Sequence, residues 1–86
     1  MKESIVGGKA FYYAFKIIPV YQQLTCQKEF VISNQFLRCS TSIGANIEEA
    51  TAGSSRKDFA AKMSIASKEV RESRYWLRLI AESNLV

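Results

Sequence analysis

The sequence predicts an all-α protein, an antiparallel up-down helical bundle that forms one domain over residues 1–86. Three stretches of the chain repeat apolar residues at helical spacing, which indicates three amphipathic helices. Glycine occurs four times and proline once, too rarely for a turn-dense β protein. Hydrophobic residues make up 48% of the 86 residues, so one small domain can build a packed core.

The first helix is predicted over residues 6–24. Its apolar face advances by four and three residues and comprises Ala10, Ala14, Ile17, Tyr21 and Leu24. Phe11, Phe15 and Ile18 widen that face, so we expect burial over much of the circumference of the helix. Pro19 lacks the N–H that would bond to Phe15, and it should therefore kink the helix. Lys28 and Glu29 mark the loop that follows.

The second helix is predicted over residues 33–52, with Ser33 as its N-cap. Its apolar face again advances by four and three residues and comprises Phe36, Ser40, Ile43, Ile47 and Ala50. Gly44 in mid-helix costs about 1 kcal/mol relative to alanine. A cost of this kind indicates that a neighbouring helix approaches closely at Gly44.

The third helix is predicted over residues 56–82. Gly53 reads as the C-cap of the preceding helix, Ser55 as the N-cap of this one, and Asp58 as the acid of a capping box. The four-three spacing holds through the whole segment in Phe59, Met63, Ala66, Val70, Ser73, Leu77 and Ile80.

Three segments resemble one bacterial protein family closely. They read RCSTSIGANIEEA over residues 38–50, SRKDF over 55–59 and ESRYWLRL over 72–79. The family is that of the four-helix-bundle proteins encoded by intervening sequences of ribosomal RNA genes, and the accessory variability determinant of diversity-generating retroelements is a relative. The resemblance extends from Lys9 onward.

The resemblance implies a bundle that self-associates, with a pentameric ring favoured, and a connection to RNA or to a reverse-transcriptase complex. It implies no established catalysis. The family pattern continues into a fourth helix, whereas this sequence stops at Leu85-Val86. Either the given sequence is truncated or the place of the fourth helix is filled otherwise. An open bundle of three helices should expose an apolar groove, which favours association.

The net charge of +4 resides in residues 56–78, because the bases and acids of the rest of the chain cancel. One stripe of the third helix should carry Lys57, Lys68, Arg71, Arg74, Tyr75 and Arg78. Bases with an interleaved aromatic ring suit contact with nucleic-acid phosphates and bases. A solvated or subunit-pairing face is the alternative interpretation, in which Lys68 pairs with Glu72.

Five polar residues of the second helix fall beside its apolar face, namely Gln35, Arg38, Ser42, Asn46 and Glu49. They predict a structural polar network in which Arg38 or Glu49 pairs with another helix. A ligand or phosphate site built on Arg38 is the alternative.

A second apolar strip on the third helix consists of Ile65, Trp76 and Leu79, which point away from the predicted core face. This strip predicts an oligomer interface anchored by Trp76, because a short chain has no second core to cover it.

Enzymatic chemistry is not expected. The chain has no histidine, which removes the commonest general base and metal ligand. Cys26 and Cys39 fit small hydrophobic roles, and the adjacent Glu48 and Glu49 cannot flank one substrate. We therefore expect no metal, no cofactor and no small-molecule substrate. No export signal or membrane span is visible, so a cytoplasmic location is expected.

These observations together predict a non-enzymatic, self-associating accessory protein that associates with RNA through the basic face of its third helix. A purely protein-binding oligomeric scaffold with no nucleic-acid role is the alternative.

Overall fold

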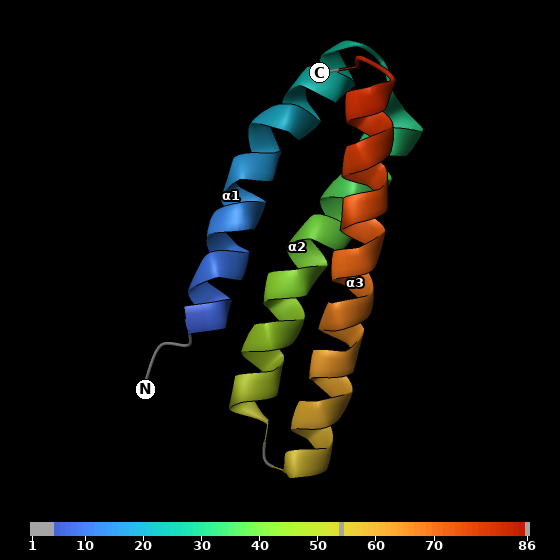
Figure 1. Ribbon diagram of the computed structural model, residues 1–86. Coiled ribbons are helices and arrows are strands. Elements are labelled where there is room, and N and C mark those ends of the chain that lie inside the picture. The colour runs from blue at the N-terminus through green and yellow to red at the C-terminus, as the bar shows by residue number, and fades with distance from the viewer. Residues whose placement is uncertain (1–4, 54, 86) are drawn as a thin grey trace.

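The computed structural model describes residues 5–53 and 55–85, which form three helices and, within these ranges, no strand. The helices are α1 (Ile5–Cys26), α2 (Phe30–Ala52) and α3 (Arg56–Glu82). They alternate in direction, so the predicted up-down helical architecture is confirmed (Figure 1). None of the three helices is long and apolar enough to cross a membrane.

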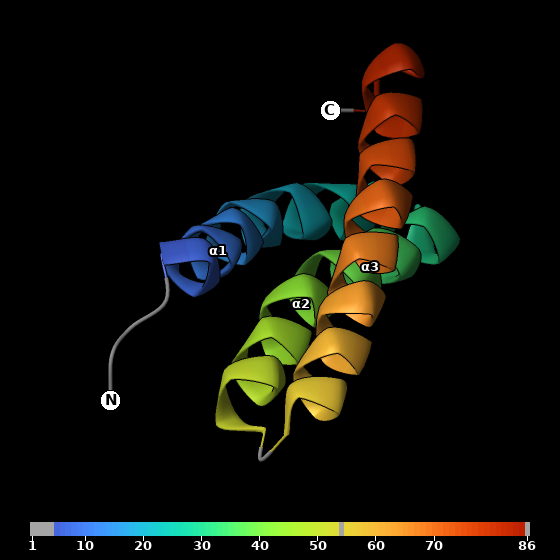
Figure 2. The ribbon, with the colours of Figure 1, turned by 60° about the horizontal axis from the view of Figure 1, so that its bottom comes forward.

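The helix α2 lies between the other two and packs against both of them. The backbones of α1 and α3 stay apart, and no Cα atom of α1 comes within 8 Å of one of α3. Figure 2 shows α1 diverging from the α2–α3 hairpin toward its N-terminus and approaching α3 near its other end. The arrangement is therefore an open bundle, in which the backbones of the two outer helices pack against α2 and not against each other.

Two helices end in the same hydrogen-bonded cap. Lys28 after α1 and Asn84 after α3 adopt positive φ angles of 64° and 56°. The N–H of Glu29 then bonds to Leu24 O at 3.0 Å, and the N–H of Leu85 bonds to Ile80 O at 3.2 Å. This is the Schellman pattern, built here without glycine. The predicted loop at Lys28 and Glu29 is thereby confirmed.

The start of α2 differs from the prediction. The helix begins at Phe30 with Glu29 as N-cap, so the prediction of Ser33 as N-cap is wrong. Ser33 is fully buried, and its Oγ donates to Phe30 O at 3.1 Å. It lies three residues before Phe36 and seven before Ser40, so it extends the buried face of α2 by one turn.

The caps predicted at Gly53 and Ser55, between α2 and α3, are confirmed. Ser55 is the N-cap of α3, and its Oγ accepts a hydrogen bond from the N–H of Asp58 at 3.0 Å. Gly53 caps α2 and its N–H bonds to Ala50 O. Its φ of −65° is one that any residue adopts, so the left-handed freedom of glycine is not used there.

The core consists of two apolar clusters joined by a chain of hydroxyl groups. Buried members of the two clusters are Ala10, Ile43, Ile47 and Ala66 in the first, and Ile17, Leu24, Phe36 and Ile80 in the second. Between them the Tyr13 hydroxyl lies 2.7 Å from Ser73 Oγ, and Ser73 Oγ lies 2.8 Å from Ser40 Oγ. Three helices thus share one buried polar contact.

The packed face of α3 is rotated relative to the predicted one. Its buried residues are Ala66, Glu69, Ser73 and Ile80. Phe59, Val70 and Leu77 were expected in the core, but they remain 44%, 47% and 41% exposed. The apolar stripe of α3 is wider than one neighbour can cover, and the single neighbour α2 takes only the side nearer Glu69.

The wide apolar face of α1 is likewise only half covered. The structure buries Ala10, Ile17 and Leu24, but Phe11, Phe15 and Ile18 are 72%, 63% and 44% exposed. The expectation that α1 is buried over much of its circumference is therefore wrong within one chain. Its backbone packs against α2 alone, which covers one side of the helix.

Candidate functional site

Arg38 on α2 joins three side chains around its guanidinium group. Its Nε donates to Gln35 Oε1 at 3.2 Å, and its Nη1 donates to Glu69 Oε2 at 2.9 Å. Its Nη2 pairs with the carboxylate of Glu72. Glu69 is only 6% exposed, so the charge of Arg38 compensates a carboxylate that packing holds against α2.

The remaining members of the predicted polar network are paired as well. Asn46 Nδ2 donates to the carbonyl and the hydroxyl of Ser42, both at 2.9 Å. Glu49 forms an ion pair of 2.9 Å with Lys62 of α3. Arg38 and Glu49 therefore pair across to α3 as predicted, and this geometry favours the structural interpretation over a ligand site on Arg38.

The two cysteines occupy different environments. Cys26 is exposed at the end of α1, whereas Cys39 is fully buried on α2. Burial raises the pKa of the Cys39 thiol above its ordinary value, and the charge of Glu72 adds to the rise. The thiol is therefore protonated at neutral pH, in keeping with the role of a small hydrophobic side chain.

The predicted basic stripe lies on the outward side of α3, away from α2. All of its members are exposed, namely Lys57, Lys68, Arg71, Arg74, Tyr75 and Arg78. Arg71 Nη1 donates to Ser67 Oγ at 3.2 Å, and Arg78 lies 3.6 Å from Glu82 in an exposed ion pair. The ring of Tyr75 meets that of Trp76 edge to face, with centroids 5.3 Å apart.

Two acids of α3, Glu69 and Glu72, face α2 rather than this stripe. The alternative interpretation paired Lys68 with Glu72, but the Glu72 carboxylate is turned to Arg38 and to the indole N–H of Trp76. Glu69 is likewise directed at Arg38. The helix therefore separates its charges, with two acids toward α2 and the bases toward solvent.

The predicted interface residues Ile65, Trp76 and Leu79 do not share one environment. Ile65 and Leu79 are 43% and 37% exposed, but Trp76 is half-buried and packs against the cluster that contains Phe36 and Ile80. The expectation that Trp76 points away from the core is wrong, because the rotated packing of α3 brings it to the edge of that core.

An exposed apolar surface larger than that of Ile65 and Leu79 lies on α1. It was not predicted as an exposed surface from the sequence. It lies on the outer side of the α1–α2 pair, around a cavity of about 360 Å³. We call it the outer α1 face, and its members include Phe11, Phe15, Ile18, Ala45 and Glu48. The sequence signal for this surface was the pair Phe11 and Phe15, because a helix that is packed on one side cannot bury both of these aromatic side chains in addition to its core face.

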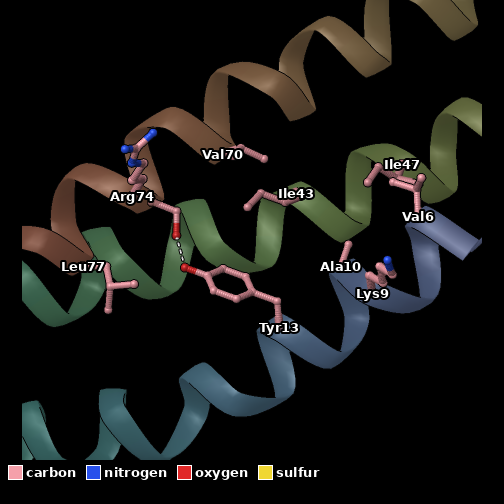
Figure 3. A pocket seen from close by; sticks show the side chains of 10 residues that line it. Val6, Lys9, Ala10, Tyr13, Ile43, Ile47, Val70, Arg74 and Leu77 are labelled. Carbon is pink, nitrogen blue, oxygen red and sulfur yellow. Dashed lines mark hydrogen bonds between the residues drawn. The ribbon is translucent and has the colours of Figure 1, made fainter.

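On the other side of α1, a groove runs between α1 and α3 above α2 and holds a cavity of about 440 Å³. Its α1 wall carries Val6, Ala10 and Tyr13, its floor Ile43 and Ile47, and its α3 wall Val70 and Leu77. Figure 3 shows the Tyr13 ring between the two walls, with its hydroxyl bonded to α3. We call this the α1–α3 groove. The predicted apolar groove of an open three-helix bundle is thereby confirmed.

In residues 5–53 and 55–85, no three His, Cys, Asp or Glu side chains are placed to hold a metal ion. Glu48 lines the cavity of the outer α1 face, whereas Glu49 is directed at Lys62. The candidate site is therefore a set of surfaces: one basic and two apolar.

Comparison with known proteins finds a family model and solved structures that are similar to this chain. A family model described as 23S rRNA-intervening sequence protein matches residues 2–86. A crystal structure of a protein of unknown function, from the S23 ribosomal protein family of Bacteroides thetaiotaomicron, is 46% identical in sequence with a TM-score of 0.91. The alignment covers 95% of this chain and 77% of that one. No curated protein sequence matches the chain.

Proposed function

Because the chain belongs to the 23S rRNA-intervening sequence protein family, we propose that it is a non-enzymatic accessory protein that contacts RNA backbones through α3. The observation that carries this proposal is the separation of charge on α3. Glu69 and Glu72 face Arg38, so Lys68, Arg71, Arg74 and Arg78 form an outward surface of mostly uncompensated positive charge.

The chemistry of this surface suits phosphate rather than base recognition. Lysine and arginine side chains on a convex helix face reach phosphate oxygens, and Tyr75 offers one ring for stacking on an unpaired base. The face has no paired donors and acceptors held in a fixed frame that could read base edges. We therefore expect binding that is salt-sensitive and weakly selective for sequence.

The test is a salt titration of binding to a structured RNA, with a charge-matched control. The stripe variant carries Lys68→Gln, Arg71→Gln and Arg78→Gln, and the control carries Lys9→Gln, Lys16→Gln and Lys28→Gln. Removing three phosphate contacts should lower the slope of log Kd against log salt by roughly 2–3, and the control should leave it nearly unchanged. Equal losses in both variants would show that net charge alone drives binding. Absence of binding at low salt would favour the scaffold alternative.

We further propose that the protein self-associates, and one observation favours the outer α1 face as the main contact. Phe11 and Phe15 are each more than 60% exposed, and burying a side chain of this size contributes about 1.5–3 kcal/mol. Ile65 and Leu79 offer a smaller second contact, whereas Trp76 is largely used within its own chain.

Sedimentation velocity separates the two contacts. Phe11→Lys combined with Phe15→Lys should shift a multimer to monomer, whereas Ile65→Lys combined with Leu79→Lys should have the smaller effect. Circular dichroism is the check that each variant keeps its helices. A wild-type chain that sediments as a monomer at micromolar concentration would overturn self-association, and the reverse ranking of variants would move the interface to α3.

A further inference from the structure

An open hollow lies on the outward side of α3, beside the ring of Tyr75. It has a volume of about 170 Å³ and is lined by Tyr75, Arg78, Leu79 and Glu82, and we call it the Tyr75 hollow. These residues stand at positions i, i+3, i+4 and i+7, so they share one face over two turns of the helix. Sites that enclose a small molecule hold roughly 300–1,000 Å³. The Tyr75 hollow is smaller and open, so it suits a flat group that rests on it with one face.

The ring of Tyr75 rests against an anchored neighbour. It meets the indole ring of Trp76 at an interplanar angle of 75°, with centroids 5.3 Å apart. Trp76 is itself held in place, because it packs against the core cluster of Phe36 and Ile80 and its indole N–H donates to Glu72 at 3.4 Å. Tyr75 stays 61% exposed. The helix therefore presents an aromatic ring to solvent beside a ring that the core fixes.

Positive charge borders this ring along the helix. Lys68 and Arg71 precede Tyr75 by seven and four residues, so they lie on its side of α3. Arg78 lines the hollow itself, where its ion pair with Glu82 is 3.6 Å long and exposed. An exposed pair contributes little, so the guanidinium group is free to turn to a phosphate. Lys68 and Arg78 are about 15 Å apart along the helix axis, and the backbone of a nucleic-acid strand can therefore be held on both sides of Tyr75.

This combination distinguishes unpaired from paired nucleotides. In a duplex each base is stacked between its neighbours, so side chains on a convex helix reach the phosphates but not the flat face of a base. In a loop, a bulge or a single strand the bases are free to lie on an aromatic ring. Tyr75 therefore adds to binding only where the nucleic acid is unpaired, whereas Lys68 and Arg71 act on both forms.

We propose that the Tyr75 hollow holds one unpaired base of an RNA, stacked on the Tyr75 ring, which gives unpaired RNA an affinity that duplex RNA does not receive. The inference rests on the RNA contact proposed above and deepens it, because it names the class of RNA. The selection concerns pairing and not sequence, since an aromatic ring accepts the flat face of any base.

The test compares an unstructured, labelled RNA of about 12 nucleotides with the same strand annealed to its full complement. Fluorescence anisotropy at low salt should show Tyr75→Leu binding the single strand about 5- to 100-fold more weakly, because stacking on one aromatic side chain carries that share of the affinity. The duplex should lose less than about twofold, since its bases do not reach the ring. Tyr75→Phe keeps the ring and should bind both RNAs as the wild type does.

Tyr12 provides the matched control. It is 60% exposed on α1, with Lys16 Nζ 5.3 Å from the centre of its ring, and it lies on another helix than the basic stripe. Tyr12→Leu should leave both affinities unchanged.

Trp76, the single tryptophan of the chain, gives a second readout. Its fluorescence should change when the single strand binds and stay constant with the duplex, because only a stacked base comes next to the Tyr75–Trp76 pair. Tyr75→Leu should abolish the change. Circular dichroism is the check that each variant is folded.

Three results would overturn the inference. One is an equal effect of Tyr75→Leu on the two RNAs, including no effect on either, and another is a loss for Tyr75→Phe as large as that for Tyr75→Leu. The third comes from sedimentation velocity, because Leu79 also belongs to the smaller contact considered for self-association. If Tyr75→Leu dissociates a wild-type multimer, a second copy covers the hollow.

The stacking site and the RNA contact fail separately. Loss of binding in the variant with Lys68→Gln, Arg71→Gln and Arg78→Gln, without a selective effect of Tyr75→Leu, would overturn the stacking site alone. Absence of binding to either RNA at low salt would overturn both.

Discussion

At the scale of single residues, Ser73 connects the three helices. Its Oγ is within hydrogen-bond distance of Tyr13 on α1 and of Ser40 on α2. Ser40 and Ser73 are 0% and 1% exposed, whereas Tyr13 is only half-buried. Replacing Ser73 therefore removes two hydrogen bonds. Losing the bond to Ser40 leaves the Ser40 hydroxyl without its partner in a place that water cannot easily reach.

We expect Ser73→Ala to lower the free energy of unfolding by about 1–3 kcal/mol, and Tyr13→Phe by about 0.5–1.5 kcal/mol. The smaller loss follows because Ser40 and Ser73 keep each other as partners when the tyrosine hydroxyl is removed. Urea unfolding followed by circular dichroism measures both values. A larger loss of unfolding free energy for Tyr13→Phe than for Ser73→Ala would contradict the importance of the buried hydrogen bond between Ser40 and Ser73.

Arg38 and Glu69 offer a second measurement at this scale, by a double-mutant cycle. Arg38→Met should lower the free energy of unfolding by about 1–3 kcal/mol, because it leaves the buried Glu69 carboxylate without its cation. Adding Glu69→Leu should recover part of that loss, with a coupling energy of about 1 kcal/mol or more.

The exposed pair of Glu49 and Lys62 is the matched control for that cycle. Both side chains are in contact with water, so its coupling should be at most about 1 kcal/mol. Equal coupling energies in the two cycles would contradict the importance of burial for Arg38 and Glu69.

At the scale of elements, Gly44 sets how closely α1 approaches α2. A Cβ atom placed on Gly44 would lie 3.7 Å from Ala10 Cβ and 3.8 Å from the backbone of Phe11, which is ordinary contact. The predicted close approach is thus confirmed, with just enough space for a methyl group.

We therefore expect Gly44→Ala to be neutral or to stabilise the protein by up to about 1 kcal/mol, through its helix propensity. Gly44→Leu should destabilise it by about 1–3 kcal/mol, since the larger side chain must push α1 away. Thermal unfolding of the two variants gives the signs. Destabilisation by Gly44→Ala would show that the approach of α1 is tighter than these distances.

The helices themselves could be predicted from the sequence because apolar periodicity and capping chemistry are local. Ser55 and Asp58 correctly predicted the start of α3. Ser33 was wrongly predicted as an N-cap, because the sequence alone does not distinguish a buried serine inside a helix from a serine that caps one. Which part of a wide apolar stripe is buried is not local. Val70 and Trp76 were assigned to the wrong environments, since their burial depends on the rotation of α3 against α2.

The candidate site was predictable to a similar degree. The members of the basic stripe and the pairing of Arg38 and Glu49 across helices follow from their positions on one helix face. The partner of Glu72 did not follow, because Lys68 on the same helix and Arg38 on another are both within reach of a carboxylate. Only the packed arrangement selects between them.

At the scale of the whole molecule, the α2–α3 hairpin and α1 are secured unequally. Ion pairs of Arg38 and Lys62 connect α2 to α3, while α1 packs its backbone against α2 alone and has one hydroxyl bond to α3. Elements with fewer packed sides open with lower free energy.

We therefore expect amide hydrogens of α1 to exchange faster than those at the centres of α2 and α3. Hydrogen–deuterium exchange with mass spectrometry, at a concentration where the chain is monomeric, measures this difference. Tyr13→Phe should accelerate exchange in α1 more than in α3. Identical rates along all three helices would mean that the bundle opens as one cooperative unit.

The central place of α2 also has a consequence for a chain that is still being synthesised. The α1–α2 hairpin leaves the ribosome first, but Arg38 and Ser40 find their partners 31 to 34 residues later in α3. At about 5–20 residues per second, translation needs roughly 2–7 s to supply them. During that interval the nascent hairpin carries Arg38 and Ser40 without their α3 partners on the face that α3 will cover. The third helix to emerge thereby supplies the partners of the first hairpin.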